Sequence, residues 1–214
     1  MNALDAKFII SDETELRGFH PDTHELAIKK CLPALDEHCR QFIARSPFLC
    51  LSTQHKNGSE DVSPRGNAPG FVQVLDNQTL LIPDRPGNNR LDSLSNILSN
   101  PSVALIFMVP GFEDTLRVNG TACLSRDPDL LRNMAVNGRL PTLAIAISVK
   151  EAFLHCAKAL RRAKLWKADS LQPRSEMKSM IGMIMEQSSG SQPEPATLDA
   201  AEKSLEEEYD RTMY

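Results

Sequence analysis

Short runs in which apolar and polar residues alternate follow one another from Pro47 onwards. This two-residue period, interrupted by turn sequences such as KNGSE and DNQ, is typical of β-strands. The runs are Phe48–Thr53, Val62–Arg65, Gly70–Leu75 and Thr79–Pro83. They predict a meander of antiparallel strands, the beginning of a β-barrel or a sandwich.

Three further runs carry the strand pattern into the second half of the chain. Ser102–Val109 is almost continuously apolar, which predicts a central strand buried on both faces. Thr115–Leu124 alternates, with Arg117 and Asn119 on the side that points away from the core. Thr142–Val149 has only small residues on one face, which suits a subunit contact, the cover of a flat ring or tight internal packing.

Helical spacing of apolar residues appears between and around these strands. The segment His24–Arg45 predicts two helices, because the first must end near Cys31 and Asp36 begins the second. A Met-rich stripe in Ser175–Gln187 predicts a helix that packs onto the barrel or onto a partner subunit. Further helices are predicted over 89–99, Asp127–Met134 and Ala157–Lys167.

The length of 214 residues allows one domain with appendages. The patterns divide the chain into a helical arm at 1–46, a barrel at 47–170, a packing helix at 171–187, and a linker with an acidic tail at 188–214. The chain shows no internal repeat.

Charge and cysteine content narrow the partners and the compartment. A net charge of −4 gives no general attraction to nucleic acid or to an anionic membrane, so we expect neither as a partner. The five cysteines form no CxxC pair, which favours reduced thiols in a cytoplasmic protein and no metal site. No stretch has the roughly 20 apolar residues that a membrane helix needs, and no signal-length apolar run begins the sequence.

The most informative stretch for chemistry is Ile82–Ser99, where a turn leads into a helix. The two asparagines before the helix can cap it, and arginines flank its start. Because the N-terminus of a helix favours anions, Arg85, Arg90 and the Ser93 hydroxyl can converge on one phosphate. The alternative is a capped surface helix whose arginines are only solvated.

A second cationic segment lies at Ala157–Lys167, where five basic residues accompany Trp166, the single tryptophan. A solvated helix face is one interpretation of this patch. The tryptophan ring beside cations can instead cover a flat anionic ligand by stacking. A third interpretation is a small barrel that binds nucleic acid through this patch.

Four segments, taken together, resemble the pyridoxamine 5′-phosphate oxidase-like family of FMN-binding split barrels. They are SPRGNAPGFV at 63–72, residues 80–107 with RPGNNR, DTLRVNG at 114–120 and CAKALRRAKLW at 156–166. The resemblance covers about residues 30–170 and implies a mainly β fold, an antiparallel split β-barrel with flanking helices. It also implies a homodimer with FMN in a groove between two barrels, acting as a flavin-dependent oxidoreductase on an unidentified small substrate, with NAD(P)H as a possible electron donor.

The resemblance places the cofactor site residue by residue. Arg65 and Asn67 fall beside the flavin phosphate and ring, the turn and helix start hold the phosphate, and Arg117 reaches the ring from the other subunit. The C-terminal basic segment falls near the flavin edge. No catalytic residue and no metal ligand stands out. The predicted cofactor-binding residues are Arg65, Asn67, Arg85, Asn88, Asn89, Arg90, Leu91, Ser93, Arg117, Lys158, Arg162 and Trp166.

The chain departs from the family at its C-terminal end. Pyridoxamine phosphate oxidases end in further strands that bind the substrate, whereas this chain ends in a Met-rich helix, a linker and an acidic tail. The resemblance therefore does not extend to oxidation of vitamin B6. Two alternatives remain open: a non-catalytic flavin-binding protein for storage or sensing, and a split barrel for another flat cofactor such as haem or a deazaflavin.

Overall fold

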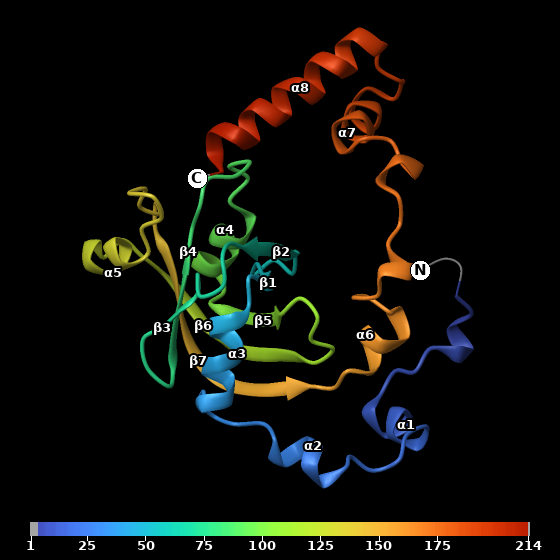
Figure 1. The fold of residues 1–214 in the computed structure, drawn as a ribbon. Helices are drawn as coiled ribbons and strands as arrows, with labels where there is room; N and C mark the ends of the chain where they lie inside the picture. The colour runs from blue at the N-terminus through green and yellow to red at the C-terminus, as the bar shows by residue number, and fades with distance from the viewer. Residues whose placement is uncertain (1–3, 214) are drawn as a thin grey trace.

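Seven antiparallel strands form one curled sheet in the computed structural model, which describes residues 4–213 (Figure 1). The strand order is β2-β1-β5-β6-β7-β4-β3, and every neighbouring pair for which the register is defined runs antiparallel. The fold is the predicted split β-barrel with flanking helices. The strands are β1 (Phe48–Gln54), β2 (Glu60–Gly66), β3 (Gln73–Val74), β4 (Thr79–Pro83), β5 (Ser102–Met108), β6 (Thr115–Ser125) and β7 (Ala144–His155).

Along the chain, helices lie before the first strand, between strands and after the last strand. Asp36 begins α3 as predicted, because its carboxylate accepts a hydrogen bond of 2.8 Å from the Cys39 amide, which also lowers the pKa of Asp36. The helices are α1 (Glu13–Gly18), α2 (Glu25–Lys29), α3 (Glu37–Arg45), α4 (Asp92–Ser99), α5 (Pro128–Asn133), α6 (Lys158–Ala163), α7 (Met180–Ser189) and α8 (Pro195–Thr212).

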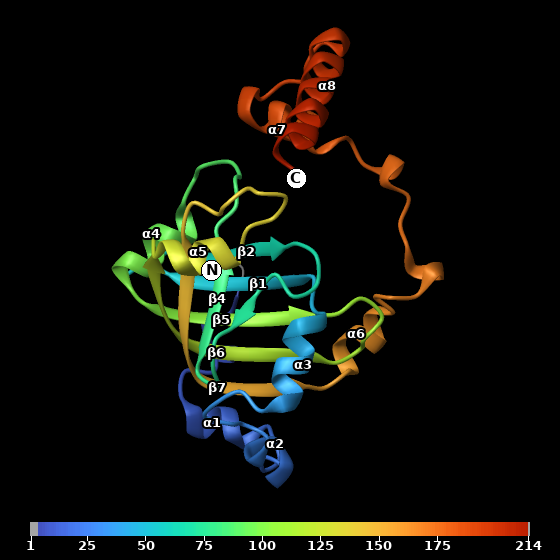
Figure 2. The same ribbon diagram turned by 60° about the vertical axis from the view of Figure 1, so that its left-hand side comes forward.

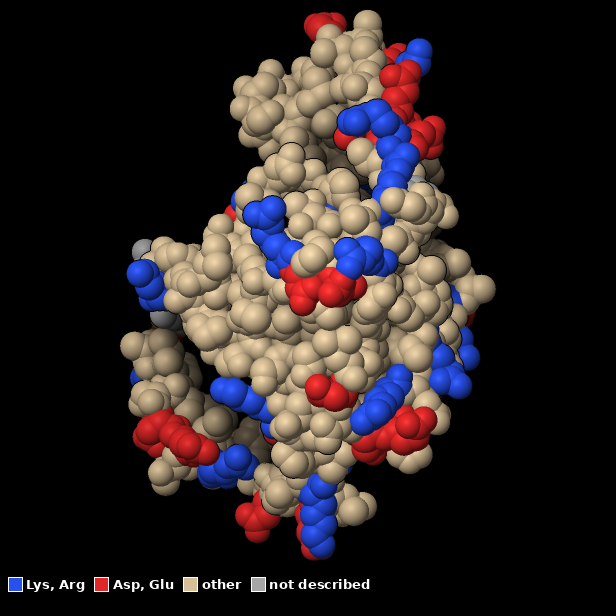
Figure 3. Space-filling model, turned by 90° about the vertical axis from the view of Figure 1, so that its left-hand side faces the viewer, with Lys and Arg blue, Asp and Glu red and all other residues tan. Residues whose placement is uncertain are grey.

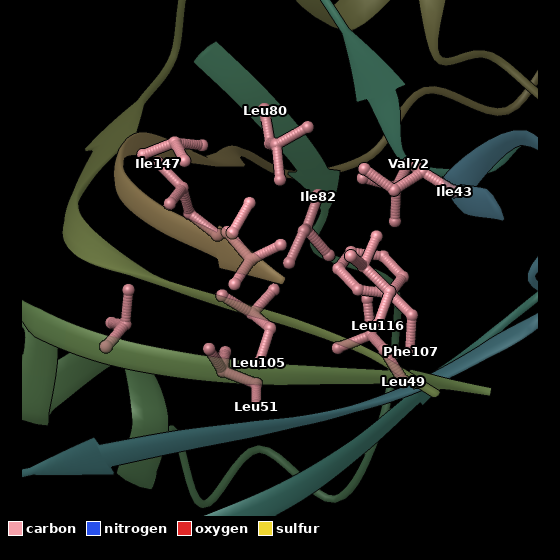
Figure 4. Packing of buried hydrophobic residues seen from close by; sticks show 14 of the residues in the cluster. Ile43, Leu49, Leu51, Val72, Leu80, Ile82, Leu105, Phe107, Leu116 and Ile147 are labelled. Atoms are coloured by element: carbon pink, nitrogen blue, oxygen red, sulfur yellow. The ribbon is translucent and has the colours of Figure 1, made fainter. Parts of the chain in front are cut away.

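The core fills the inside of the curled sheet (Figure 4). Leu49, Leu51 and Phe107 come from its first strands and are almost completely buried. Ile43 of α3 and Ile97 of α4 pack against the same cluster, so these two helices cover the open ends of the sheet. Each fully buried side chain of this size contributes about 1.5–3 kcal/mol to stability. The predicted inward-facing residues thus hold the barrel together.

A bulge lets β7 run to His155, beyond the predicted end at Val149. Asn119 of β6 pairs with Glu151, but the next residue, Gly120, pairs with Val149, so Lys150 is an extra residue in β7. The extra residue shifts the buried positions of β7 by one, from Val149 before the bulge to Ala152 after it. A Cβ at Gly120 would lie 2.2 Å from the Ser148 carbonyl oxygen, so the two strands fit together only with glycine there.

Strand β5 is not buried on both faces, which corrects the expectation from its apolar run. Val103, Leu105 and Phe107 are buried, but Ala104 and Ile106 are only half-buried. The second face of the sheet at β5 is therefore covered only in part within one chain. An apolar run does not distinguish this case from a strand with two covered faces.

Other predicted elements are shorter or displaced. β3 covers only two residues of the predicted run Gly70–Leu75. α6 ends at Ala163, because Lys164 takes a left-handed conformation with φ 50°. α7 begins at Met180 rather than Ser175, and α8 makes the predicted acidic tail a continuous helix from Pro195.

The predicted small-residue face of β7 is partly covered by α5. Ala144 is fully buried in a small cluster with Leu81, Leu131 and Met134. Tight internal packing therefore explains this end of the face. Farther along the strand Ser148 is exposed, so the rest of the face is open.

The segments before and after the barrel extend away from it (Figures 1 and 2). Residues 4–30 are exposed along their whole length. The Met-rich helix α7 has its main contacts with α8, not with the barrel as predicted. All five cysteines are free in the described part of the chain, and burial raises the pKa of Cys39 to about 11, so that thiol stays protonated. Across residues 4–213, no helix combines the length and apolar character needed to span a membrane.

Candidate functional site

A hollow of about 710 Å³ lies between β2 and the segment from Pro83 to Leu94. Its size falls within the range of about 300–1,000 Å³ that is usual for small-molecule sites. Residues far apart in the sequence meet there, because α4 packs against β1 and β2. The predicted residues that line the hollow are Arg65, Asn67, Arg85, Asn88, Asn89, Arg90, Leu91 and Ser93.

The turn before α4 leaves the start of the helix open. Asn89 and Leu91 both have left-handed backbones, with φ 57° and 61°. Leu91 is the N-cap residue that precedes α4, and no side chain among the described residues caps the helix. The predicted capping by asparagine is therefore wrong: Asn88 instead accepts a hydrogen bond of 3.1 Å from the Arg90 amide within the turn. An uncapped helix start at the wall of a hollow is suited to an anion.

Arg65 is a half-buried cation of the hollow. Its Nη1 donates to Oδ1 of Asp84 at 3.3 Å, and the two side chains are only 19% and 16% exposed. Its Nε is buried and has no hydrogen-bond partner among residues 4–213. A buried donor without a partner is unfavourable, so this atom is available for an acceptor on a ligand.

The other predicted phosphate ligands have protein partners, and they do not converge as expected. Ser93 donates its hydroxyl proton to Asp61 Oδ2 at 2.6 Å. Arg90 pairs through Nε with Asp92 Oδ2 at 2.7 Å, and this hydrogen bond raises the pKa of Arg90. The guanidinium of Arg85 instead donates to backbone carbonyls in the loop after α5, those of Met134 and Arg139. Arg85 thus fixes the wall of the hollow to that loop.

The prediction missed the carboxylates and the aromatic ring of the hollow. Its acidic residues are Asp61, Asp84 and Asp92, which balance the three arginines. Phe71 adds an apolar wall. The sequence carried one usable signal, since Asp84 and Asp92 stand next to or near predicted arginines. It gave no sign of the pairing of Asp84 with Arg65, which depends on how the strands fold.

The remaining four predicted residues are not among those that line the hollow. Arg117 Cζ lies 5.0 Å from the centre of the Phe153 ring, and Lys30 Nζ lies 5.4 Å from the same ring. Trp166 donates from Nε1 to the Phe112 carbonyl at 2.6 Å and is 39% exposed. Lys158 and Arg162 are exposed on α6. Within one chain these residues form no common site with the hollow.

A family model described as pyridoxamine 5′-phosphate oxidase matches residues 35–156. No curated protein matches.

Three solved structures have a fold similar to that of this chain. HupZ of Group A Streptococcus has 14% identity and a TM-score of 0.47, covering 56% of this chain and 93% of that one. A provisionally assigned pyridoxamine 5′-phosphate oxidase of Lactobacillus delbrueckii has 22% identity and a TM-score of 0.44, covering 57% and 95%. An F420 reductase has 18% identity and a TM-score of 0.41, covering 55% and 98%.

Proposed function

The chain belongs to the pyridoxamine 5′-phosphate oxidase family, and from this premise we propose that it is an FMN-binding flavoprotein that acts as an oxidoreductase on a small substrate. The observation that carries the proposal is the hollow beside α4. It gathers a half-buried cation, an uncapped helix start and an apolar wall in one place. These are the groups that a phosphate-bearing, flat coenzyme requires.

The residues present fit FMN at both of its ends. Arg65 offers a buried Nε donor without a protein partner, and the first amides of α4 add donors for a phosphate. Phe71 and Pro64 give apolar cover for a ring, and Asn67 supplies an amide. The three aspartates of the hollow oppose phosphate binding, because two of them already pair with arginines that a phosphate would otherwise contact. Arg65 and Arg90 are therefore expected to exchange their carboxylate partners for phosphate when FMN binds.

FMN supplies hydride and electron transfer when it is bound. The chain supplies the binding and the orientation. Arg65 and the start of α4 hold the anionic end, and Asn67 donates or accepts at the polar edge of the ring. Phe71 excludes water from one side. No histidine is among the described residues that line the hollow.

The proposal includes a homodimer with FMN between two barrels. Arg117, Lys158, Arg162 and Trp166 lie outside the hollow of their own chain. In a homodimer, the second copy of the chain would bring these four residues to the flavin ring. The half-covered outer face of β5 supports such an arrangement, because Ile106 there is not fully covered in one chain.

The test is to follow the visible spectrum of the purified protein. We expect the protein to be yellow, or to become yellow after incubation with FMN and removal of the excess, and mass spectrometry of the released coenzyme should identify FMN. A protein that stays colourless contradicts the proposal. Reduction of the bound flavin by NADH or NADPH, with turnover on an acceptor, supports an oxidoreductase. Bound flavin that neither donor reduces favours the storage or sensing alternative, and release of haem or a deazaflavin instead identifies the other one.

Arg90 is expected to contribute less to FMN affinity than Arg65. Its side chain is 73% exposed and already pairs with Asp92, so solvent screens its attraction to a phosphate. We expect Arg90→Ala to weaken FMN binding by about fivefold or less, measured by fluorescence quenching of free flavin. A loss as large as that of an Arg65 variant would contradict this ranking and would mean that the turn holds the phosphate as strongly as β2 does.

A further inference from the structure

The chain exposes far more surface than a compact protein of its mass. Its accessible surface is 14628 Å², whereas a compact monomer of 23.7 kDa exposes about 9,800 Å². The difference is roughly 5,000 Å² for one chain, whereas obligate interfaces bury about 1,000–2,500 Å² or more on each partner. Residues 4–30 and 161–169, which lie on either side of the family match, are exposed throughout. The chain is therefore shaped to be covered by a partner.

The C-terminal hairpin, which consists of α7 and α8, has little support from its own barrel. Its helices pack against each other where Leu198 reaches Gly182: a Cβ at Gly182 would lie 3.2 Å from Leu198 Cδ1. The hairpin follows a long irregular segment after α6 and lies away from the barrel except at the C-terminal end of α8, where Arg211 contacts Arg139 (Figures 1 and 2). Apolar side chains on this segment and on α7 are uncovered, among them Leu171 at 72% and Met177 at 64% exposure.

One side of α8 is acidic and unpaired. Four carboxylates recur every three or four residues, so they lie on one side of the helix. None of them makes an ion pair within residues 4–213, unlike Glu207 and Glu208, which pair with basic residues of α8 itself. Acidic side chains line one side of the hairpin in Figure 3. The four carboxylates are Asp199, Glu202, Glu206 and Asp210.

The complementary positive charge lies on a different part of the chain, segment 158–167. Segment 158–167 contains five basic residues and no acidic one. Lys158 and Arg162, four residues apart on α6, make no ion pair in the described part of the chain. One chain thus displays an acidic helix side and a basic helix side that it does not bring together.

We infer that the α7–α8 hairpin clasps a second copy of this chain, with the acidic side of α8 against segment 158–167 of that copy. The inference rests on the proposed homodimer and concerns a part of the chain outside the family match. A second copy is the partner that fits, because the same chain supplies both charges, and a two-fold axis forms the contact twice.

The clasp also completes the proposed site. Arg139 joins the hairpin to the wall of the hollow: its Nη1 donates to the Arg211 carbonyl at 3.4 Å, and its own carbonyl accepts from Arg85 at 3.2 Å. A basic segment docked on α8 therefore comes to lie beside the hollow. It carries Trp166 and the two unpaired cations of α6, the predicted site residues that one chain leaves outside.

The experiment reverses the two charges separately in the full-length chain. One variant is Glu206→Lys with Asp210→Lys, and the other is Lys158→Glu with Arg162→Glu. Sedimentation equilibrium at low salt, without added flavin, measures the dissociation constant of the dimer. We expect each variant alone to raise that constant at least tenfold, because attraction becomes repulsion at both symmetric contacts. A mixture of the two variants is expected to form heterodimers with an affinity within threefold of the unchanged protein.

The matched control is Glu207→Lys with Glu208→Lys, which changes the charge of α8 equally on residues that pair within the helix. We expect this control to leave the dissociation constant unchanged. A monomeric unchanged protein, equal affinities for all variants, or a mixture that stays as weak as its components overturns the clasp. FMN titration is read separately: if flavin binds while charge reversal has no effect, only the clasp fails, and if charge reversal acts on a colourless protein, only the flavin proposal fails.

Discussion

Replacing Arg65 by methionine is expected to weaken FMN binding by about 1.5–3 kcal/mol, or roughly 10- to 150-fold. The Arg65 side chain is only 19% exposed, and its Nε is a buried donor without a hydrogen-bond partner among the described residues. A charge-assisted hydrogen bond at such a position is stronger than one at the surface. Titration of the apoprotein with FMN, followed by flavin fluorescence, measures the loss.

Two variants separate binding from folding in this experiment. Arg132→Met removes an arginine that is 61% exposed on α5 and does not line the hollow, so it should leave FMN affinity unchanged. Arg65→Met also leaves Asp84 without its partner, which lowers stability. Adding Asp84→Asn should recover that stability in urea unfolding but not the affinity. Equal affinities for the Arg65 variant and the unchanged protein would place the phosphate elsewhere.

Replacing Gly120 by alanine is expected to lower the free energy of unfolding by about 1–3 kcal/mol, the usual cost of an added methyl group in a packed site. The new Cβ would meet the Ser148 carbonyl oxygen at 2.2 Å, and this atom belongs to the backbone of the neighbouring strand. The strands must therefore separate at the bulge. Thermal unfolding should show a decrease in Tm of roughly 3–10 °C.

The matched control for this prediction is Gly18→Ala in α1. No heavy atom lies within 4 Å of a Cβ at Gly18, and its φ is not in the left-handed region. This variant should unfold at the same temperature as the unchanged protein or slightly above it. If Gly120→Ala is as stable as this control, the contact between β6 and β7 is not as tight as the structure has it.

Alternation in the sequence was sufficient to place the strands that form the barrel. β4 has its predicted bounds, and β1, β5 and β6 differ from theirs by a residue at most. The reason is that a two-residue period directly encodes which side chains point inward. The N-terminal bound of α3 was equally readable, because an aspartate that caps a helix acts within three residues of itself.

The sequence did not allow us to predict which residues pair across long distances along the chain. The bulge at Gly120 depends on which residue of β7 lies opposite, and the pairing of Arg65 with Asp84 depends on the fold of two strands around the hollow. The same limit explains why Arg85, predicted at a phosphate, binds the loop after α5 instead. Neither the contact of α7 with α8 nor the covered end of the small-residue face could be predicted, since both depend on which surface is nearby in space.

The sequence by itself determined the barrel, its family and the group of residues around the turn before α4, because periodicity and short motifs act over a few neighbouring positions. Only the tertiary structure decided which of those residues share one hollow, which are already bound to carboxylates or carbonyls, and how much surface stays uncovered. These are properties of distances between segments remote in the chain, and such distances follow from the packing of the whole core.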